Sequence, residues 1–225
     1  MDKYLQIVNS DNKFNPSDYA DFEYVDDITV NYPDAGEKAF IEKETYDAYL
    51  ALKKFLGKKR IPCSLNSAGR TVNAQRLTQQ EMYGIYLKEY EQNNPHDQAV
   101  TLAKQKVLDM VAVPGYSEHH TGLAIDVSPR KYGKNPLTKY LAKQYNKKHL
   151  NAYFEFINKV APQFGFIVRY TRENAESTGV KRPEPWHLRY VGKECAMEIA
   201  TIMETDPSYS LEKYVAERIG GSTRV

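Results

Sequence analysis

Apolar residues recur at helical spacing in several parts of the chain. In the stretch KETYDAYLALKKFLGK, residues 43–58, tyrosines, leucines and a phenylalanine share one stripe, and Gly57 can end the helix. A later apolar pattern, beginning at residue 135, predicts one or two helices that end near Pro162 and Gly165. Helices are therefore predicted over residues 43–58, 72–92, 98–109, 135–165, 193–204 and 210–219.

Short apolar runs predict strands at residues 61–71, 123–127, 166–171 and 185–192, the first of them running into a Ser/Gly turn. These strands are short, and no G-x-G-x-x-G motif opens a helix. The predicted fold class is therefore α+β, a small antiparallel sheet covered by helices, rather than a doubly wound parallel fold.

The first 40 residues lack a helical period and are rich in Asp, Asn, Pro and Tyr. They predict an extended arm with turns at NPSD and YPDAGEK. We expect residues 1–40 to form an N-terminal arm packed on the domain, and residues 41–225 to form a single domain.

The strand LAIDV, residues 123–127, alternates so that Leu123, Ile125 and Val127 face one side while Asp126 faces the other. Burial of the apolar face leaves the carboxylate free to point into a cleft. Counted back without a break, the same alternation selects His120 rather than His119.

Gly122, however, is a natural place for a turn or bulge, which would reset the alternation. Spacing by itself leaves His119 and His120 undecided.

A second polar group lies in EPWHLRY, residues 184–190. As a strand it sends Trp186 to the same face as the apolar residues, and His187 and Arg189 to the other face. Trp186 fits either a cleft or the core. Glu184 precedes Pro185 at the start of the strand, where its carboxylate could reach around the edge.

One histidine of the first segment, Asp126 and His187 make three N/O ligands. Three protein ligands leave a fourth zinc position for water, which is the signature of a catalytic site, and zinc lowers the pKa of that water to about 7. Glu184 could then take its proton. The alternative is a set of scattered polar residues with structural roles.

The segments SEHHTGLAID and EPWH resemble the S-x-H-x-x-G-x-A-x-D … E-x-W-H signature of the zinc D-alanyl-D-alanine carboxypeptidase and dipeptidase family. This family includes the vancomycin-resistance VanY-like D,D-carboxypeptidases and related L,D-carboxypeptidases. The resemblance implies that His119, Asp126 and His187 bind Zn²⁺ and that Glu184 is the general base. It places His120 in a variable position.

The stretch NSAGRTVNAQ is similar to the G-Y-R-S-x-x-x-Q segment of the family, with Ala-Gly where Gly-Tyr is common. The resemblance implies that Arg70 stabilises the oxyanion of the tetrahedral intermediate and that Gln75 supports substrate placement. Ser117 matches the residue that helps to hold the terminal carboxylate of the substrate. The similarity extends over about residues 4–205 and includes the arm.

The function implied is a zinc-dependent D,D-carboxypeptidase that removes the C-terminal D-alanine from peptidoglycan stem peptides, and acts on free D-Ala-D-Ala as well. The alternatives are an L,D-carboxypeptidase on tetrapeptide stems and a peptidoglycan endopeptidase. Selectivity among them is expected to depend on the segments 130–150 and 171–185.

Two other classes compete with this hypothesis. The motifs SDNK, SLN and HTG occur in the order found in serine penicillin-binding enzymes, but each is short and SDNK sits in a predicted loop. A non-catalytic zinc-containing binding module is disfavoured because both Glu184 and Arg70 are present. No H-E-x-x-H occurs, which disfavours other zinc peptidases.

Composition limits the partners. A net charge of +2 argues against nucleic-acid binding, and no apolar run is long enough to span a membrane. No signal peptide is recognisable, so we expect a cytoplasmic location, or the cell-envelope exterior if an export segment was removed. Cys63 and Cys195 are expected to be separate core thiols, and the chain is expected to be a monomer.

Overall fold

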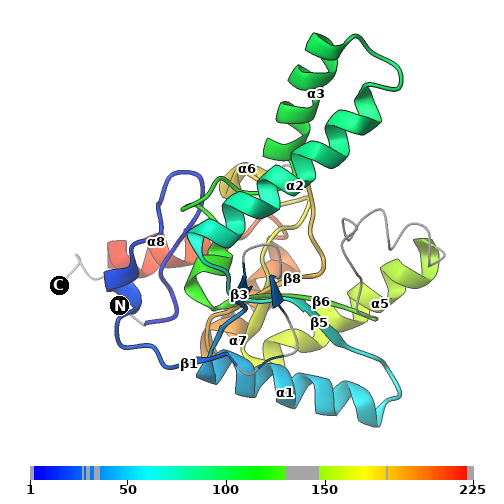
Figure 1. Cartoon of the computed structure of the whole chain (residues 1–225). Helices are drawn as coiled ribbons and strands as arrows, with labels where there is room; N and C mark the ends of the chain where they lie inside the picture. The colour runs from blue at the N-terminus through cyan, green and yellow to red at the C-terminus, as the bar shows by residue number, and fades with distance from the viewer. Residues whose placement is uncertain are drawn as a thin grey trace.

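The computed structural model describes residues 3–26, 28, 31–32, 36–129, 147–180 and 182–221. It contains a four-stranded antiparallel sheet, two short hairpin pairs and helices around them (Figure 1). The predicted α+β class with a small antiparallel sheet is confirmed.

The central sheet has the strand order β5–β6–β8–β7. Every neighbouring pair in it is antiparallel, and a register shift between Leu65 and Ser67 marks an irregularity in the first strand. Its strands are β5 (Ser64–Ser67), β6 (Ala124–Ser128), β7 (Phe166–Val168) and β8 (His187–Tyr190).

One face of this sheet is apolar and forms the main core. Leu123, Ile125, Val127 and Leu188 are fully buried there, as the strand alternation predicts. The opposite face carries the polar side chains. This division follows from the period of two along each strand, which sends successive side chains to opposite faces.

The helix α1 (Lys43–Lys58) has the predicted bounds and packs its buried residues, Leu52 and Leu56 among them, on the core. Its N-terminus is capped by Glu42, whose side chain accepts a hydrogen bond from the backbone of Thr45 at 2.8 Å. Gly57 does not end it, because the helix continues for one more residue and Lys59 is the C-cap.

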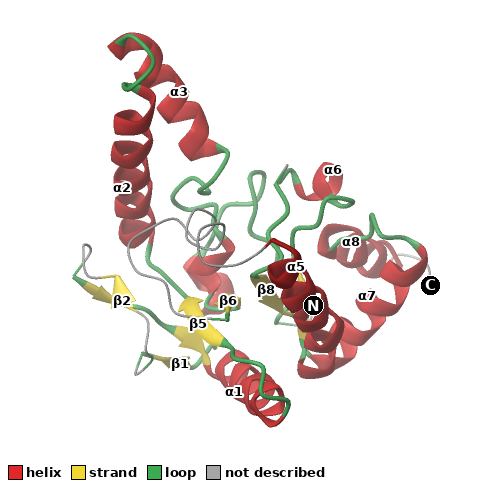
Figure 2. Cartoon of the chain, turned by 90° about the vertical axis from the view of Figure 1, so that its right-hand side faces the viewer, coloured by secondary structure: helices red, strands yellow, loops and turns green. Residues whose placement is uncertain are grey.

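Helices α2 (Val72–Tyr90) and α3 (His96–Leu108) form a hairpin that projects from the sheet (Figures 1 and 2). Apolar residues between them, including Met82, Tyr86 and Val107, make a small core of their own. The predicted helix over 98–109 begins two residues earlier, at His96.

Of the remaining helices, two pack on the same main core as α1, through Ile157 and Ala161, and the last two of the chain enclose a second core with Ile167 and Val191. Gly165, with φ +88°, terminates the 3-10 helix η4 and leads into β7. These elements are α5 (Lys147–Val160), η4 (Ala161–Phe164), α6 (Ala175–Thr178), α7 (Lys193–Thr205) and α8 (Leu211–Gly221). The first part of the helix predicted over 135–165 lies outside the described residues.

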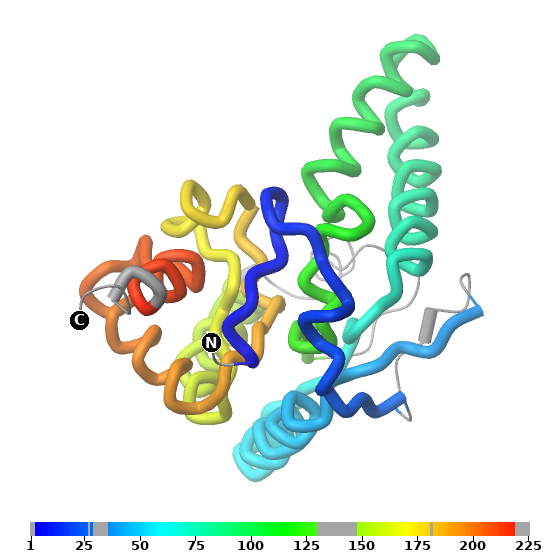
Figure 3. Tube along the Cα trace, turned by 90° about the vertical axis from the view of Figure 1, so that its left-hand side faces the viewer, coloured from blue at the N-terminus to red at the C-terminus, as the bar shows by residue number. Residues whose placement is uncertain are grey.

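The N-terminal arm crosses the molecule next to the C-terminal helices (Figure 3). Its turn at NPSD is a 3-10 helix, η1 (Pro16–Tyr19), and Tyr4, Val8 and Tyr19 are buried in the main core. The hairpin strands are β1 (Tyr24–Val25), β2 (Asn31–Tyr32), β3 (Glu37–Lys38) and β4 (Ile41–Glu42), paired β1–β4 and β2–β3. The arm is therefore hydrogen-bonded into the fold as well as packed on it.

Candidate active site

Asp126 and His187 are directly opposite each other on neighbouring antiparallel strands, β6 and β8. Side chains opposite in this way project from the same face and come close together. The Nδ1 atom of His187 lies 3.2 Å from Oδ1 of Asp126. The sheet therefore supplies two of the three predicted metal ligands.

His119 reaches the same place from a short 3-10 helix, η3 (Glu118–Thr121). Its Nε2 lies 3.5 Å from Oδ2 of Asp126, and its Nδ1 donates to the carbonyl oxygen of Ala68 at 2.8 Å. This second bond directs Nε2 toward the site, as is usual for metal-binding histidines. The candidate ligand atoms of His119, Asp126 and His187 all lie within 4.8 Å of one another.

His120 points elsewhere and uses both of its ring nitrogens. Its Nδ1 lies 2.8 Å from the carbonyl oxygen of Arg70, and its Nε2 accepts the backbone N–H of Gly115 at 2.9 Å. An imidazole that donates through Nδ1 and accepts through Nε2 is neutral, and burial lowers its pKa. Both ring nitrogens of His120 are therefore used in hydrogen bonds to the backbone, and neither is directed at the cluster of candidate ligands.

Gly122 lies between the 3-10 helix η3 and the strand β6. It has φ +73° and caps η3, and the strand begins two residues later. A Cβ at this position would lie 2.8 Å from Cε1 of Tyr24 and 3.0 Å from the backbone nitrogen of Glu42. Only glycine suits this turn, and the turn breaks the alternation that would otherwise select His120.

The charges of the cluster are strongly coupled. Burial and the nearby Arg70 guanidinium lower the pKa of His119 to about 4. Burial also disfavours the charged form of His187, but the carboxylates of Asp126 and Glu118 outweigh it and raise its pKa to about 9. Burial opposes the charge of Asp126 too, yet the two histidines hold its pKa well below the usual range.

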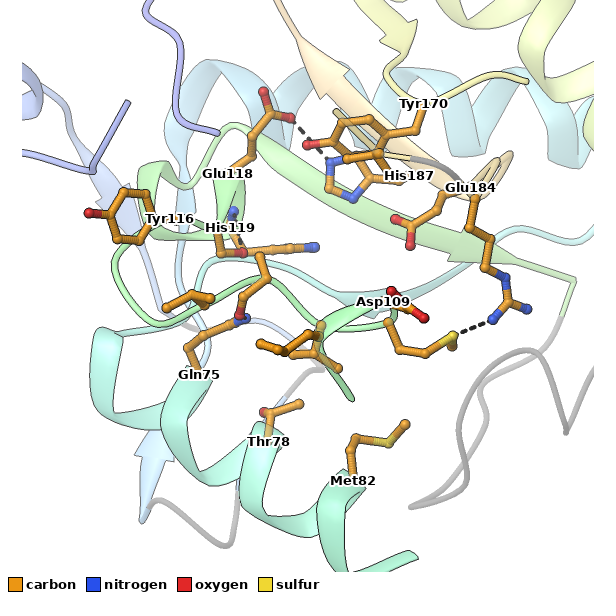
Figure 4. Close-up of a pocket in the computed structure, with 18 of the residues that line it drawn as sticks. Gln75, Thr78, Met82, Asp109, Tyr116, Glu118, His119, Tyr170, Glu184 and His187 are labelled. Carbon is orange, nitrogen blue, oxygen red and sulfur yellow. Dashed lines mark hydrogen bonds and ion pairs between the residues drawn. The ribbon is translucent and has the colours of Figure 1, made fainter. Parts of the chain in front are cut away.

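Glu184 lies at the edge of the cluster, with its carboxylate in the pocket near His187 (Figure 4). The backbone N–H of Glu184 donates to the carbonyl oxygen of Tyr170 at 2.9 Å, and the backbone carbonyl of Glu184 accepts from the backbone N–H of His187 at 3.0 Å. Burial raises the pKa of Glu184 to about 7, while the charges of His187 and the arginines lower it in part. A carboxyl group with such a pKa is suited to exchange protons near neutral pH.

Arg70, Gln75 and Ser117 line the same cleft, which has a volume of about 960 Å³. Arg70 forms no ion pair with any described residue, and its Nε is buried without a hydrogen-bond partner among them. Gln75 is fully buried and donates through Nε2 to the carbonyl oxygen of Ala112 at 2.6 Å, so its Oε1 remains for another donor. The oxygen of Ser117 caps η3 by accepting from the backbone of His119.

Trp186 departs from the predicted strand alternation. Residues 185–186 form a turn ahead of β8, so Trp186 does not join Leu188 in the main core. It is half-buried, lies 6.3 Å from the Phe154 ring and lines the cleft. Both cysteines are free and buried, as expected.

Three charged residues behind the site belong to none of the predicted motif roles. Glu118, Arg169 and Arg189 have side chains that are fully shielded from solvent and bonded to one another. Arg189 shares the polar strand face with His187, and an arginine at such a position needs a buried acid. That requirement was a usable signal, but the sequence does not say which acid meets it.

The serine alternative is not supported by these positions. Residues 9–12 form a turn closed by two backbone hydrogen bonds between Asn9 and Asn12, so Ser10 does not open a helix. The histidine of HTG is His120, whose nitrogens are both engaged.

Two imidazoles and a carboxylate, gathered from two strands of the sheet and the short helix η3, lie in a cleft beside a carboxyl group with a raised pKa. Together they define the site of a metallohydrolase. The donor set fits a zinc ion, because each histidine directs one nitrogen into the cluster while the other nitrogen meets an oxygen. A sequence profile of the VanY family, described as D-alanyl-D-alanine carboxypeptidase, matches residues 38–193. The chain belongs to the VanY family.

A relative in Bacillus subtilis, YodJ, which is named as a carboxypeptidase, is 29% identical over 202 residues, covering 89% of this chain and 61% of YodJ. The chain spans less than two thirds of the length of this and the other matched relatives.

Solved structures with a similar fold agree with this assignment. The vancomycin-resistance D,D-pentapeptidase VanY, solved with Zn(II), is 27% identical with a TM-score of 0.65 and covers 95% of this chain and 99% of its own. VanYB with D-alanine-D-alanine is 26% identical, with a TM-score of 0.66 and coverage of 95% and 97%. The LD-carboxypeptidase LdcB is 25% identical, with a TM-score of 0.59 and coverage of 93% and 84%.

No helix within the described parts of the chain combines the length and apolar character needed to cross a membrane.

Proposed function

We propose that this chain is a zinc-dependent D,D-carboxypeptidase that releases the C-terminal D-alanine of peptidoglycan stem peptides and also cleaves free D-Ala-D-Ala. The observation that carries the proposal is the cluster of His119, Asp126 and His187 with Glu184 beside it in one cleft. Zinc is supported by the donor set and by the metal in the similar VanY structure. The substrate is supported by the dipeptide bound in the similar VanYB structure.

In this mechanism His119, Asp126 and His187 hold the metal, which when bound polarises the scissile carbonyl and acidifies a water. Glu184, whose carboxylate lies in the cleft near His187, accepts a proton from the attacking water and delivers it to the departing amine of D-alanine. The peptide C–N bond breaks and the new carboxylate stays with the shortened stem.

Arg70 places a fixed positive charge in the cleft, without a competing carboxylate among the described residues. Such a cation stabilises negative charge as it develops on the carbonyl oxygen, and a donor of this kind is worth about 10²–10³ in rate. Ser117 and the Oε1 of Gln75 are proposed to position the substrate. Their substrate-binding roles stay predictions.

The second candidate is an L,D-carboxypeptidase that acts on tetrapeptide stems. It is favoured by the similarity to LdcB, which covers 93% of this chain, against 95% for VanYB. The two activities differ in the stereochemistry of the residue before the scissile bond. The segment 130–146, one of the two expected to govern selectivity, lies outside the described residues.

The test is release of D-alanine from D-Ala-D-Ala, a stem pentapeptide and a stem tetrapeptide, each with and without a chelator and with penicillin. Chelator-sensitive, penicillin-resistant release from the first two would support the proposal. Release from the tetrapeptide alone would support the L,D-carboxypeptidase. Release blocked by penicillin would revive a serine mechanism, and no release from any substrate would overturn the proposal.

A further inference from the structure

Behind the candidate metal cluster, His187 is held between two carboxylates. Its Nδ1 faces Asp126 at 3.2 Å, and its Nε2 lies 3.3 Å from Oε2 of Glu118 on the far side (Figure 4). Glu118 has no solvent-exposed side-chain surface. A proton on Nε2 would be donated to Glu118, which leaves the Nδ1 lone pair directed at the cluster.

The other oxygen of Glu118 is held by two arginines. Its Oε1 accepts from Nε of Arg169 at 2.8 Å and from Nη1 of Arg189 at 3.1 Å. Both guanidinium groups are completely buried. A buried carboxylate without such donors would be costly, so the arginines allow Glu118 to remain charged next to His187.

Each arginine also binds a segment near one end of the chain: Arg189 binds the N-terminal arm, and Arg169 binds the helix α8. Arg189 donates through Nη2 to the carbonyl oxygens of Tyr4 at 3.1 Å and Gln6 at 2.8 Å. Arg169 donates through Nη1 to Oε2 of Glu212, on α8, at 3.0 Å. Glu212 in turn accepts from the Asn9 side chain at 3.1 Å, so the arm and the last helix meet at this network.

The charges of this network balance. Glu118 and Glu212 contribute two negative charges, and Arg169 and Arg189 contribute two positive ones. Removal of one member leaves a buried charge without compensation, and Oε2 of Glu118 lies 3.3 Å from Nε2 of the His187 ring on the cluster side. The network therefore has the means to transmit a change at the chain ends to a candidate ligand.

We propose that Glu118 is a positioning residue that orients His187 for metal binding, and that the arm and α8 set metal affinity through Arg189, Arg169 and Glu212. The inference rests on the proposed function, because it takes His187 as a ligand. A carboxylate that accepts from the second nitrogen of a histidine ligand fixes its tautomer and orientation, and loss of such a group costs about 10–100-fold in metal affinity.

The test is zinc affinity, measured on the full chain by competition with a chromophoric chelator. Glu118→Gln should lose about 10–100-fold in affinity, and Glu212→Gln should lose affinity in the same direction but less. Glu198→Gln is the matched control, because Glu198 also pairs an arginine between α7 and α8, Arg218 at 2.6 Å, yet has no bond to the network. The control should keep the wild-type affinity.

Nitrogen-15 NMR of the His187 ring separates positioning from a general loss of structure. In the metal-free form, at a pH above the value of about 9 at which the His187 ring loses its charge, the wild-type ring should keep its proton on Nε2, whereas Glu118→Gln should show a mixture of tautomers. If Glu118→Gln does not fold, as judged by circular dichroism, Glu212→Gln decides the question, since that side chain lies at the outer end of the network. Unchanged zinc affinity in the folded variants would overturn the inference.

These outcomes are independent of the proposed activity. If the wild-type chain binds zinc but releases no D-alanine, the proposed function fails while the positioning role can still be measured. If the wild-type chain binds no zinc, His187 is not a ligand and both proposals fall.

Discussion

His119 and His120 are adjacent in the chain, but their rings serve different structures. His119 sends Nε2 to within 3.5 Å of Asp126, whereas His120 bridges the carbonyl of Arg70 and the backbone N–H of Gly115. His119 is thereby placed to bind a metal, and His120 ties together the two segments that carry Arg70 and His119. Substitution of the two histidines is therefore expected to affect zinc binding in opposite ways.

We expect His119→Ala to abolish stoichiometric zinc binding, measured by metal analysis after dialysis. His120→Ala should keep its zinc but lose about 1–3 kcal/mol of unfolding free energy, because it leaves the buried N–H of Gly115 and the part-buried carbonyl of Arg70 without this partner. Urea unfolding of the metal-free proteins would measure that loss. Equal loss of zinc in both variants would contradict the assignment.

Glu184→Gln should retain zinc while kcat for D-Ala-D-Ala falls by about 10²–10⁴, the usual worth of a general base. Glutamine matches glutamate in size but cannot accept the proton from water. Metal content and D-alanine release would be measured on the same preparation. A kcat within twofold of the wild type would remove Glu184 from the mechanism.

The carboxyl group of Glu184 should titrate near pH 7 in the metal-free protein, well above its ordinary value of 4.5, because burial disfavours its charge. Since the folded value is the higher one, the contribution of this group to the stability of the metal-free protein falls as pH rises from about 4.5 to about 7. A bound cation favours the carboxylate and should lower the pKa. Carbon-13 NMR of both forms, with Glu184→Gln for assignment, would measure these values.

Arg70→Met should lower kcat/KM by about 10²–10³ without loss of zinc, because it removes the cation but keeps a side chain of similar length. Arg76→Met is a suitable control. Arg76 lies on α2 and bonds only Asn73 and Gln80 among the described residues. Similar losses in both variants would mean that the effect comes from structure rather than from the charge of Arg70.

Gly122→Ala should destabilise the fold by about 1–3 kcal/mol through backbone strain alone, with a further cost from contact with Tyr24 and Glu42. Gly84→Ala is the control. It lies within α2 with nothing within 4 Å of its Cβ position, so it should stabilise the protein by about 0.5–1 kcal/mol. Thermal unfolding would compare them, and equal stabilities would contradict the role assigned to the Gly122 turn.

Much of the local structure followed from the order of apolar and polar residues. The bounds of α1 and the apolar face of β6 were predicted correctly, because the helical and strand periods are properties of the backbone itself. Prediction failed where the period was interrupted, as at Trp186, whose side chain leaves the strand alternation at a turn.

The sequence by itself determined which residues could do chemistry: a solitary Asp126 in an apolar strand, His187 on a polar strand face, Glu184 before a proline, and Arg70 after a short strand. It also determined the α+β class. These conclusions depend on the local spacing of residues and on the order of the motifs, and both are properties of the sequence itself.

Residue spacing left His119 and His120 open, and only the family resemblance pointed to His119; the tertiary structure shows that His119 turns toward Asp126, and it alone decided which acid lies behind His187. Both outcomes depend on contacts between segments far apart in sequence: Ala68 with His119, and Glu118 with Arg169 and Arg189. A buried nitrogen or carboxylate takes the partner that folding brings within hydrogen-bond distance, and no period along the chain encodes that distance.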